Sequence, residues 1–202
     1  MTIKLEDFIG LVNNDFNNIK KIAPIFGDLE TIIEDNDSHK NYSVYEHIKK
    51  VYKNTVFFLD SAHYNLKRNT TLTDRTRNIL LLKCLLHDIG KVDTGLYRGD
   101  QKIFPNHELR GSELAEPILE KIELTEEERL EVTNFVKYHT DIHKCLDGGA
   151  AKFEENLNNF KKNHGKTEDF IIFCLADIHE SYLKESNPEE YTYRINTLLG
   201  AL

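Results

Sequence analysis

The adjacent residues His87 and Asp88 are the first feature of this sequence whose types and spacing could do chemistry. They follow an apolar run over residues 81–86 and precede Gly90 and Lys91. Apolar residues on every side of a helix predict that it is buried, and a buried carboxylate is costly unless it is paired or bound to a cation. A divalent metal ion meets that need, because it keeps a carboxylate ionised and an imidazole neutral. The alternative is an ordinary helix end, where polar residues stand before a capping glycine.

Further residues of the same types occur at the ends or on the inner faces of other predicted helices, namely His47, His107, His139 and Asp177. A single inward histidine is more often a hydrogen-bonded core residue than a ligand. Together with His87 and Asp88, however, the set is hard to explain as independent core residues. Imidazole and carboxylate ligands suit iron, manganese, cobalt, nickel or zinc, and the ligand types alone do not identify which of these metals is bound. The sequence therefore predicts a site for a divalent transition metal.

The pair His139 and His143 has the spacing at which two histidines of one helix can share a zinc ion. In zinc proteases with this spacing a glutamate follows the first histidine, whereas Thr140 stands there in this sequence. A zinc protease is therefore an unfavourable alternative.

The elements that must position these residues are predicted to be helical from their apolar spacing. Ser43, with Glu46 three residues later, has the capping-box pattern and opens a helix that carries His47 on its inner face. The other site residues are expected on helices over residues 75–87, from Asn106 or His107 onward, from Thr125 to His139, and along the apolar run 170–176 that leads into Asp177.

The rest of the chain is expected to complete one helical domain. Before Ser43 the pattern predicts helices over residues 3–22 and 26–33 and a polar loop over residues 34–41. Because we see no strand pattern of weight, internal repeat or linker, we predict an all-α, single-domain bundle over residues 1–202. Its core spans about residues 40–185, and helices of residues 1–35 pack on it.

A loop or small hairpin is predicted over residues 92–106, close to His87 and Asp88, because Gly95, Gly99 and Pro105 interrupt the helical pattern. Lys91, Arg98 and Lys102 could bind an anionic ligand there. The alternative is ordinary solvated charge for Arg98 and Lys102, and for Lys91 an interaction with the helix dipole.

Composition limits the classes of function. The 202 residues carry a formal net charge of −8, which disfavours a broad nucleic-acid surface and favours a small substrate over a long RNA. The N-terminus lacks a signal-peptide pattern, and no apolar run approaches the roughly 20 residues of a membrane span. The three cysteines are scattered, as expected for packed, reduced thiols. We therefore expect a cytoplasmic protein with no membrane partner.

The order His47, then His87-Asp88, then Asp177 resembles that of the HD-domain metal-dependent phosphohydrolases. Over roughly residues 22–185 the sequence motifs look most like those of the HD domain of bacterial CCA-adding enzymes (tRNA nucleotidyltransferases). The matching segments are Tyr45-Glu46-His47, His87-Asp88-Ile89-Gly90-Lys91, Asn106-His107-Glu108, Tyr138-His139 and Ala176-Asp177. No nucleotidyltransferase motif is seen, so the resemblance concerns the hydrolase-like module alone.

The resemblance implies roles for these residues. Members with one metal use ligands at His47, His87, Asp88 and Asp177, and members with two metals add histidines in the places of His107 and His139. It also implies that Lys91 contacts substrate phosphate beside the catalytic Asp88, and Glu108 could orient His107. The predicted substrate-binding residues are Lys91, Arg98, His107 and His139.

Three functions follow from this interpretation. The first is hydrolysis of a phosphate ester on a nucleotide or an RNA end, by a 2′,3′-cyclic phosphodiesterase, nucleotidase or phosphatase reaction. The second is hydrolysis of dinucleoside polyphosphates or (d)NTPs. The third is a non-catalytic module that binds a nucleotide or a partner protein, which an intact ligand set disfavours.

Overall fold

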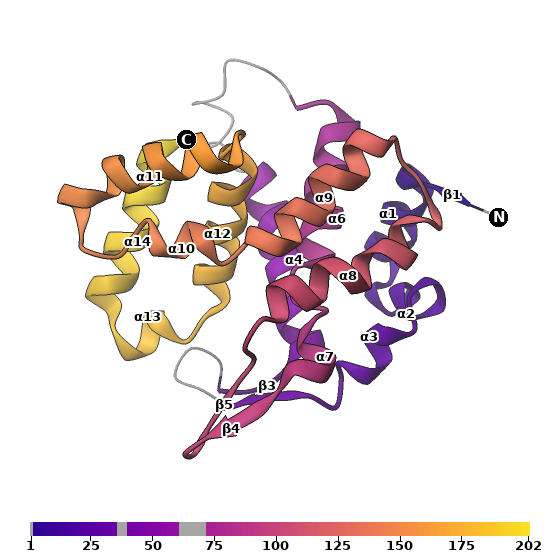
Figure 1. The fold of residues 1–202 in the computed structure, drawn as a ribbon, viewed down its shortest axis with the longest axis horizontal. Coiled ribbons are helices and arrows are strands. Elements are labelled where there is room, and N and C mark those ends of the chain that lie inside the picture. The colour runs from indigo at the N-terminus through magenta and orange to yellow at the C-terminus, as the bar shows by residue number, and fades with distance from the viewer. Residues whose placement is uncertain (1, 36–39, 61–71) are drawn as a thin grey trace. The chain divides into compact units, whose positions relative to one another are not determined.

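The computed structural model describes residues 2–35, 40–60 and 72–202, and most of these residues are helical (Figure 1). The strands in the described part are two to four residues long and form only two-stranded sheets. The predicted all-α fold is therefore confirmed. In the same part of the chain, no helix has the length and hydropathy needed to cross a membrane. The described residues form two compact units: residues 2–35, 40–50 and 72–137 make the first, and residues 51–60 and 138–202 make the second.

The first unit runs from an N-terminal strand to the penultimate residue of α9. Its elements are β1 (Ile3–Lys4), α1 (Leu5–Asn14), η1 (Phe16–Asn18), α2 (Ile19–Ile22), α3 (Ile25–Asp28), β2 (Ile33–Asp35), β3 (Lys40–Ser43), the start of α4 (Val44–Asp60), α6 (Asp74–Leu86), α7 (Lys91–Thr94), β4 (Leu96–Arg98), β5 (Gln101–Ile103), α8 (His107–Leu119), β6 (Ile122–Glu123) and α9 (Glu126–Tyr138).

Helix α6 is the buried centre of the first unit, because every residue from Ile79 to Leu86 is buried. Helix α1 packs on α6 with a face of buried apolar residues at helical spacing, Leu5, Phe8, Ile9 and Val12. The one lysine in the buried run, Lys83, donates to Glu131 of α9 at 2.7 Å. That ion pair explains how an otherwise apolar helix accommodates a charge.

The N-terminal segment differs from the prediction. Helix α3 ends at Asp28, not at residue 33, and Thr31 Oγ1 donates to the terminal carbonyl of Asp28 at 2.9 Å. Ile33 then opens β2, which pairs antiparallel with β3 in the register Ile33↔Ser43 and Glu34↔Tyr42. The predicted polar loop over residues 34–41 is therefore wrong at residues 34, 35, 40 and 41, which lie in strands, and residues 36–39 lie outside the described residues.

The hairpin expected within residues 92–106 is confirmed. Strands β4 and β5 pair antiparallel, with Arg98 opposite Gln101. Gly99 in the connection has a φ of 62°, a left-handed conformation that glycine adopts without steric cost.

The regular elements in the described part of the second unit are all helices. It contains the rest of α4 together with α10 (Asp141–Lys144), α11 (Ala150–His164), α12 (Glu168–Glu180), α13 (Leu183–Ser186) and α14 (Pro188–Ala201). Helix α12 is its centre: residues 170–176 are all buried, and α10 and α14 both pack against it.

Candidate metal centre

Helix α4 presents His47 at its first turn. Ser43 Oγ accepts the backbone N–H of Glu46 at 3.2 Å, so the predicted N-terminal cap is confirmed. Val44, Ile48 and Val51 are fully buried and recur at helical spacing. His47 lies on the same face and is 1% exposed. The inward direction of this imidazole therefore follows from the cap and the apolar stripe.

Helix α6 ends at Leu86, and His87 caps it. The Nδ1 atom of His87 lies 2.8 Å from the carbonyl oxygen of Cys84. A carbonyl only accepts, so Nδ1 carries a proton, and in the neutral tautomer Nε2 carries the lone pair. The same arrangement is typical of a histidine prepared to bind a metal ion through Nε2.

A close approach of two glycines brings α8 beside this helix end. A Cβ atom on Gly90 would lie 2.0 Å from the carbonyl oxygen of His107 and 2.4 Å from the backbone nitrogen of Gly111. Only glycine at position 90 allows this contact. It places His107, the first residue of α8, next to Asp88, and the carbonyl of Phe104 accepts the His107 Nδ1 proton at 2.7 Å.

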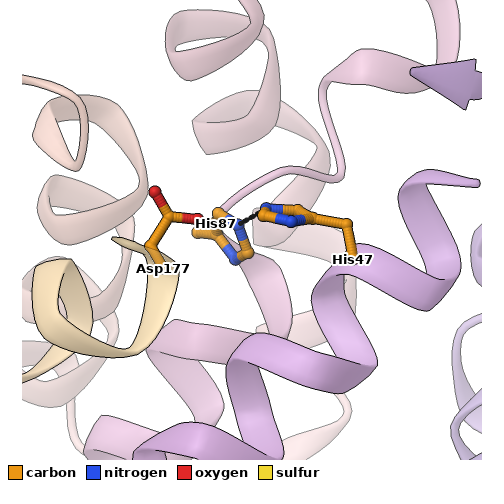
Figure 2. Close-up of side chains that lie close together, drawn as sticks. All are labelled: His47, His87 and Asp177. Atoms are coloured by element: carbon orange, nitrogen blue, oxygen red, sulfur yellow. Dashed lines mark hydrogen bonds between the residues drawn. The ribbon is translucent and has the colours of Figure 1, made fainter. Parts of the chain in front are cut away.

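Three ligand atoms meet in the first unit. The Nε2 atoms of His47 and His87 lie 3.1 Å apart, and each lies 3.1 Å from Asp88 Oδ2. Figure 2 shows the two imidazole rings with the dashed line joining their nitrogen atoms, and the ring planes are inclined at 67°. Two ligand atoms at right angles around a metal ion, each about 2.1 Å from it, are about 3.0 Å apart. The three atoms thus have the spacing of neighbouring ligands of one ion.

The other oxygen of Asp88 has its own imidazole. His107 Nε2 lies 3.3 Å from Asp88 Oδ1. With Nδ1 protonated on both His87 and His107, each neutral ring directs a lone pair at a carboxylate oxygen. Two acceptors at such distances repel unless a cation lies between them or the rings are protonated. The donor set therefore fits a divalent cation beside each oxygen of Asp88.

Lys91 is the charged neighbour of this cluster. Its Nζ atom lies 2.7 Å from Asp88 Oδ2 and 2.6 Å from Glu34 Oε1. Burial alone would lower the pKa of Lys91, but the two carboxylates outweigh burial and hold that pKa well above its ordinary range. Lys91 is therefore an ammonium ion, bound between Asp88 and Glu34. The prediction that it contacts substrate phosphate is not tested by these contacts.

The second unit carries the other predicted ligands. His139 is 3% exposed and meets the ring of Phe173 edge-on, with the ring centres 5.7 Å apart. Asp177 lies on α12, which Figure 2 also draws, and its Oδ2 atom lies 3.1 Å from His143 Nε2. Burial alone would lower the pKa of His143, but Cys174 and the Asp177 carboxylate raise it well above its ordinary range.

The remaining predicted residues have simpler surroundings. Arg98 lies on the exposed strand β4, and the contacts of the Asp88 cluster do not include it. Glu108 Oε2 is 3.5 Å from His107 Nδ1, in keeping with the prediction that Glu108 orients this histidine.

Two residues with contacts to the predicted ligands were missed. The sequence predicts a polar loop at Glu34, and it suggests only a zinc-protease pattern for His143. For His143, the spacing of one helical turn from His139 is a usable signal. For Glu34, the signal is weak, because it is one acidic residue in a polar stretch, and its burial depends on distant segments such as the one that carries Lys91.

Comparison with known protein families identifies the greater part of the chain. Residues 44–181 match the family model of the HD domain. None of the curated proteins compared with the chain matches it. The matched segment begins at the first residue of α4 and ends just after α12, so it contains the predicted ligands of both units.

Proposed function

The chain belongs to the HD-domain family of metal-dependent phosphohydrolases, and from that premise we propose that it hydrolyses a phosphate ester on a nucleotide or an RNA end. The reaction class is that of a 2′,3′-cyclic phosphodiesterase, nucleotidase or phosphatase. The observation that carries the proposal is the set of mutual 3.1 Å distances among His47 Nε2, His87 Nε2 and Asp88 Oδ2.

His47, His87 and Asp88 would hold the metal ion in the first unit. A bound transition metal lowers the pKa of water and polarises a phosphoryl oxygen. The protein's own contribution is to hold the ligands in place: the Cys84 carbonyl fixes the His87 tautomer, and Lys91 fixes one oxygen of Asp88. Asp88 is the proposed catalytic carboxylate, because it would hold the metal ion that activates the water. We keep Lys91 and Arg98 as proposed contacts of the substrate phosphate.

We propose that Asp177 and His139 of the second unit complete the ligand set. The order of ligands along the chain supports this, because the family-matched segment contains His47, His87-Asp88 and Asp177 in the order of the family's pattern. Support also comes from His143. Because its Nε2 atom faces Asp177 Oδ2 at 3.1 Å, it can hold that carboxylate in one orientation.

A second candidate is hydrolysis of dinucleoside polyphosphates or (d)NTPs at a site with two metal ions. The observation that favours two ions is the environment of Asp88, since His47 and His87 face one oxygen and His107 faces the other. Two ions can bind both the attacking and the leaving oxygen of a phosphoryl transfer. His139 is the proposed partner of His107 at the second ion.

The choice of substrate class rests on charge and on resemblance. A net charge of −8 favours a small phosphorylated molecule over a long RNA. The likeness of the motifs around His47, Asp88 and His107 to the HD domain of CCA-adding enzymes supports an RNA end or a nucleotide with a 2′ or 3′ phosphate.

The test combines metal analysis with a substrate screen. Protein purified without chelator is analysed for metal, and phosphate release is measured from nucleoside 2′-, 3′- and 5′-phosphates, cyclic phosphates and dinucleoside polyphosphates. We expect one or two ions per chain, turnover of one class, and loss of both in Asp88→Ala. Metal without turnover would favour the third function, a binding module, and no metal after addition of Mn²⁺, Fe²⁺ or Ni²⁺ would contradict the proposed centre.

A further inference from the structure

Glu34 is a buried carboxylate that lies ahead of the family-matched segment. It is 0% exposed, although it belongs to a short strand near the N-terminus. The pairing of β2 with β3 places it opposite Tyr42, two residues before α4 begins. A carboxylate buried so completely requires a charged or hydrogen-bonding partner. Lys91 is such a partner, with its Nζ atom 2.6 Å from Glu34 Oε1.

Lys91 joins Glu34 to the metal ligands. The same Nζ atom lies 2.7 Å from Asp88 Oδ2 and 5.5 Å from the centre of the Phe104 ring. The ammonium is therefore enclosed by two carboxylates and an aromatic face, and the side chain is 10% exposed. A contact this enclosed is held in one geometry and is weakly screened by salt.

An ammonium ion beside a ligand oxygen opposes metal binding. It repels a divalent cation and withdraws charge from the carboxylate that must hold that cation. A second carboxylate on the far side of the ammonium reduces both effects, because it shares the hydrogen bonds of Lys91 and cancels its charge. Glu34 is the carboxylate in that position.

We propose that Glu34 is a positioning residue of the metal centre: by binding the Lys91 ammonium, it raises the affinity of the Asp88 carboxylate for a divalent cation. The inference rests on the proposed metal centre and adds a residue from outside the family-matched segment. The N-terminal strand β2 then carries a residue that adjusts the metal affinity of the site, in addition to packing against the rest of the unit.

The experiment measures Mn²⁺ affinity by calorimetric titration of chelator-stripped protein. The variants are Glu34→Gln, the double variant Glu34→Gln with Lys91→Met, and the control Glu30→Gln. Glu30 lies in the same N-terminal segment, where its carboxylate pairs with Lys20. Thermal unfolding without metal is recorded for each variant, so that a change in affinity is separated from a change in folding.

The inference predicts a specific pattern. Glu34→Gln leaves the Lys91 charge on Asp88 alone and should weaken Mn²⁺ binding about 10- to 100-fold, as is typical for residues that support a metal ligand. The double variant removes both charges and should return the affinity to within about threefold of wild type. Glu30→Gln should bind Mn²⁺ as wild type does.

Other outcomes would overturn the inference. If Glu34→Gln and the double variant bind equally weakly, Glu34 is a direct ligand; its carboxylate does lie with ligand atoms of His47 and Asp88 within 4.8 Å. If Glu34→Gln binds like wild type, Glu34 serves packing alone. Should Glu34→Gln fail to fold, the double variant decides, because a direct ligand predicts a loss of more than about tenfold there. Wild-type protein that binds no Mn²⁺, Fe²⁺ or Ni²⁺ would refute the metal centre itself.

Discussion

At the scale of single residues, one carboxylate in the first unit is contacted by several of the predicted site residues. Asp88 has His47, His87 and Lys91 around Oδ2 and His107 at Oδ1. Both oxygens of this one side chain are therefore engaged from different elements. The ammonium of Lys91 supplies the positive charge that the buried Asp88 carboxylate requires. His107 faces a different oxygen of Asp88 from His47 and His87.

His107→Ala tests this separation. If each oxygen of Asp88 serves its own ion, this variant should lose one of two metal ions and about 100-fold or more in turnover. His47→Ala should disturb the other ion, and the two variants are compared by metal analysis after dialysis against a metal-free buffer. Unchanged metal content in His107→Ala would contradict the two-ion interpretation and leave His107 as a substrate contact.

At the scale of elements, the approach of α8 to the turn after α6 determines whether Asp88 and His107 can meet. Gly90 and Gly111 make this approach with backbone against backbone, since a Cβ atom at position 90 would overlap the His107 carbonyl at 2.0 Å. A flexible side chain could move aside, but a carbonyl in the first turn of a helix cannot move without shifting the helix.

Gly90→Ala should therefore lower the free energy of unfolding by about 3 kcal/mol or more, because backbone must shift to admit one methyl group. It should also weaken metal binding by moving His107 away from Asp88. Gly10→Ala is the matched control: nothing lies within 4 Å of a Cβ at Gly10, so alanine in α1 should stabilise by about 0.5–1 kcal/mol. Urea unfolding measures both, and equal stability of the two variants would contradict the close approach.

Arg75 at the start of α6 ties three other elements to that helix. It donates to Glu128 of α9 at 2.7 and 2.6 Å, to Glu6 of α1 at 3.3 Å, and to the carbonyl of Glu123 in β6 at 2.9 Å. Hydrogen bonds from Arg75 hold the pKa of Glu128 below its ordinary value of 4.5. A carboxyl whose pKa is lowered by folding stabilises the fold above its unfolded pKa.

Acid unfolding tests this tie. The contribution of Glu128 should be present above about pH 4.5 and be lost as the pH falls through its lowered pKa. Glu128→Gln should be less stable at pH 7 by about 1 kcal/mol, since the pair is partly exposed, and the difference from wild type should shrink below pH 4. Glu127→Gln, at the neighbouring exposed position, should change stability less, because it removes only a charge near the helix N-terminus. A pH-independent difference for Glu128→Gln would contradict the ion pair.

At the scale of the whole molecule, the predicted metal ligands are divided between two compact units. The first unit contains His47, His87, Asp88 and His107, and the second contains His139 and Asp177. The family-matched segment, residues 44–181, includes parts of both. That the chain is a single HD-type domain stays a prediction. Metal binding by the proposed ligands should stabilise the folded chain.

Metal addition should therefore raise the melting temperature. A ligand at 100 times its Kd stabilises a folded protein by about 2.7 kcal/mol, which corresponds to about 5–10 °C for a chain of this size. Scanning calorimetry with EDTA and with Mn²⁺ measures the shift. Asp88→Asn and Asp177→Asn should each abolish most of it, and a full shift in Asp177→Asn would show that Asp177 is not a ligand.

Several features of this protein could be predicted from the sequence because their causes are local. The helical framework follows from apolar spacing and caps, as at Ser43, where the hydroxyl and the N–H it accepts are three residues apart. The inward direction of His47 follows from its place in the stripe around Val44, Ile48 and Val51. The types of the residues predicted a metal site, since buried imidazoles and carboxylates require a cation. The HD-domain order of those residues then pointed to the family.

The tertiary structure decided the contacts between distant segments. Glu34 and Lys91 are 57 positions apart, and nothing in the stretch around Glu34 indicates that it is buried. Glu34 is buried where its strand meets Lys91 and β5, and the close approach at Gly90 sets where His107 meets Asp88. The physical reason is that the partner of a buried charge depends on which elements pack together, whereas helix formation depends on residues a few positions apart.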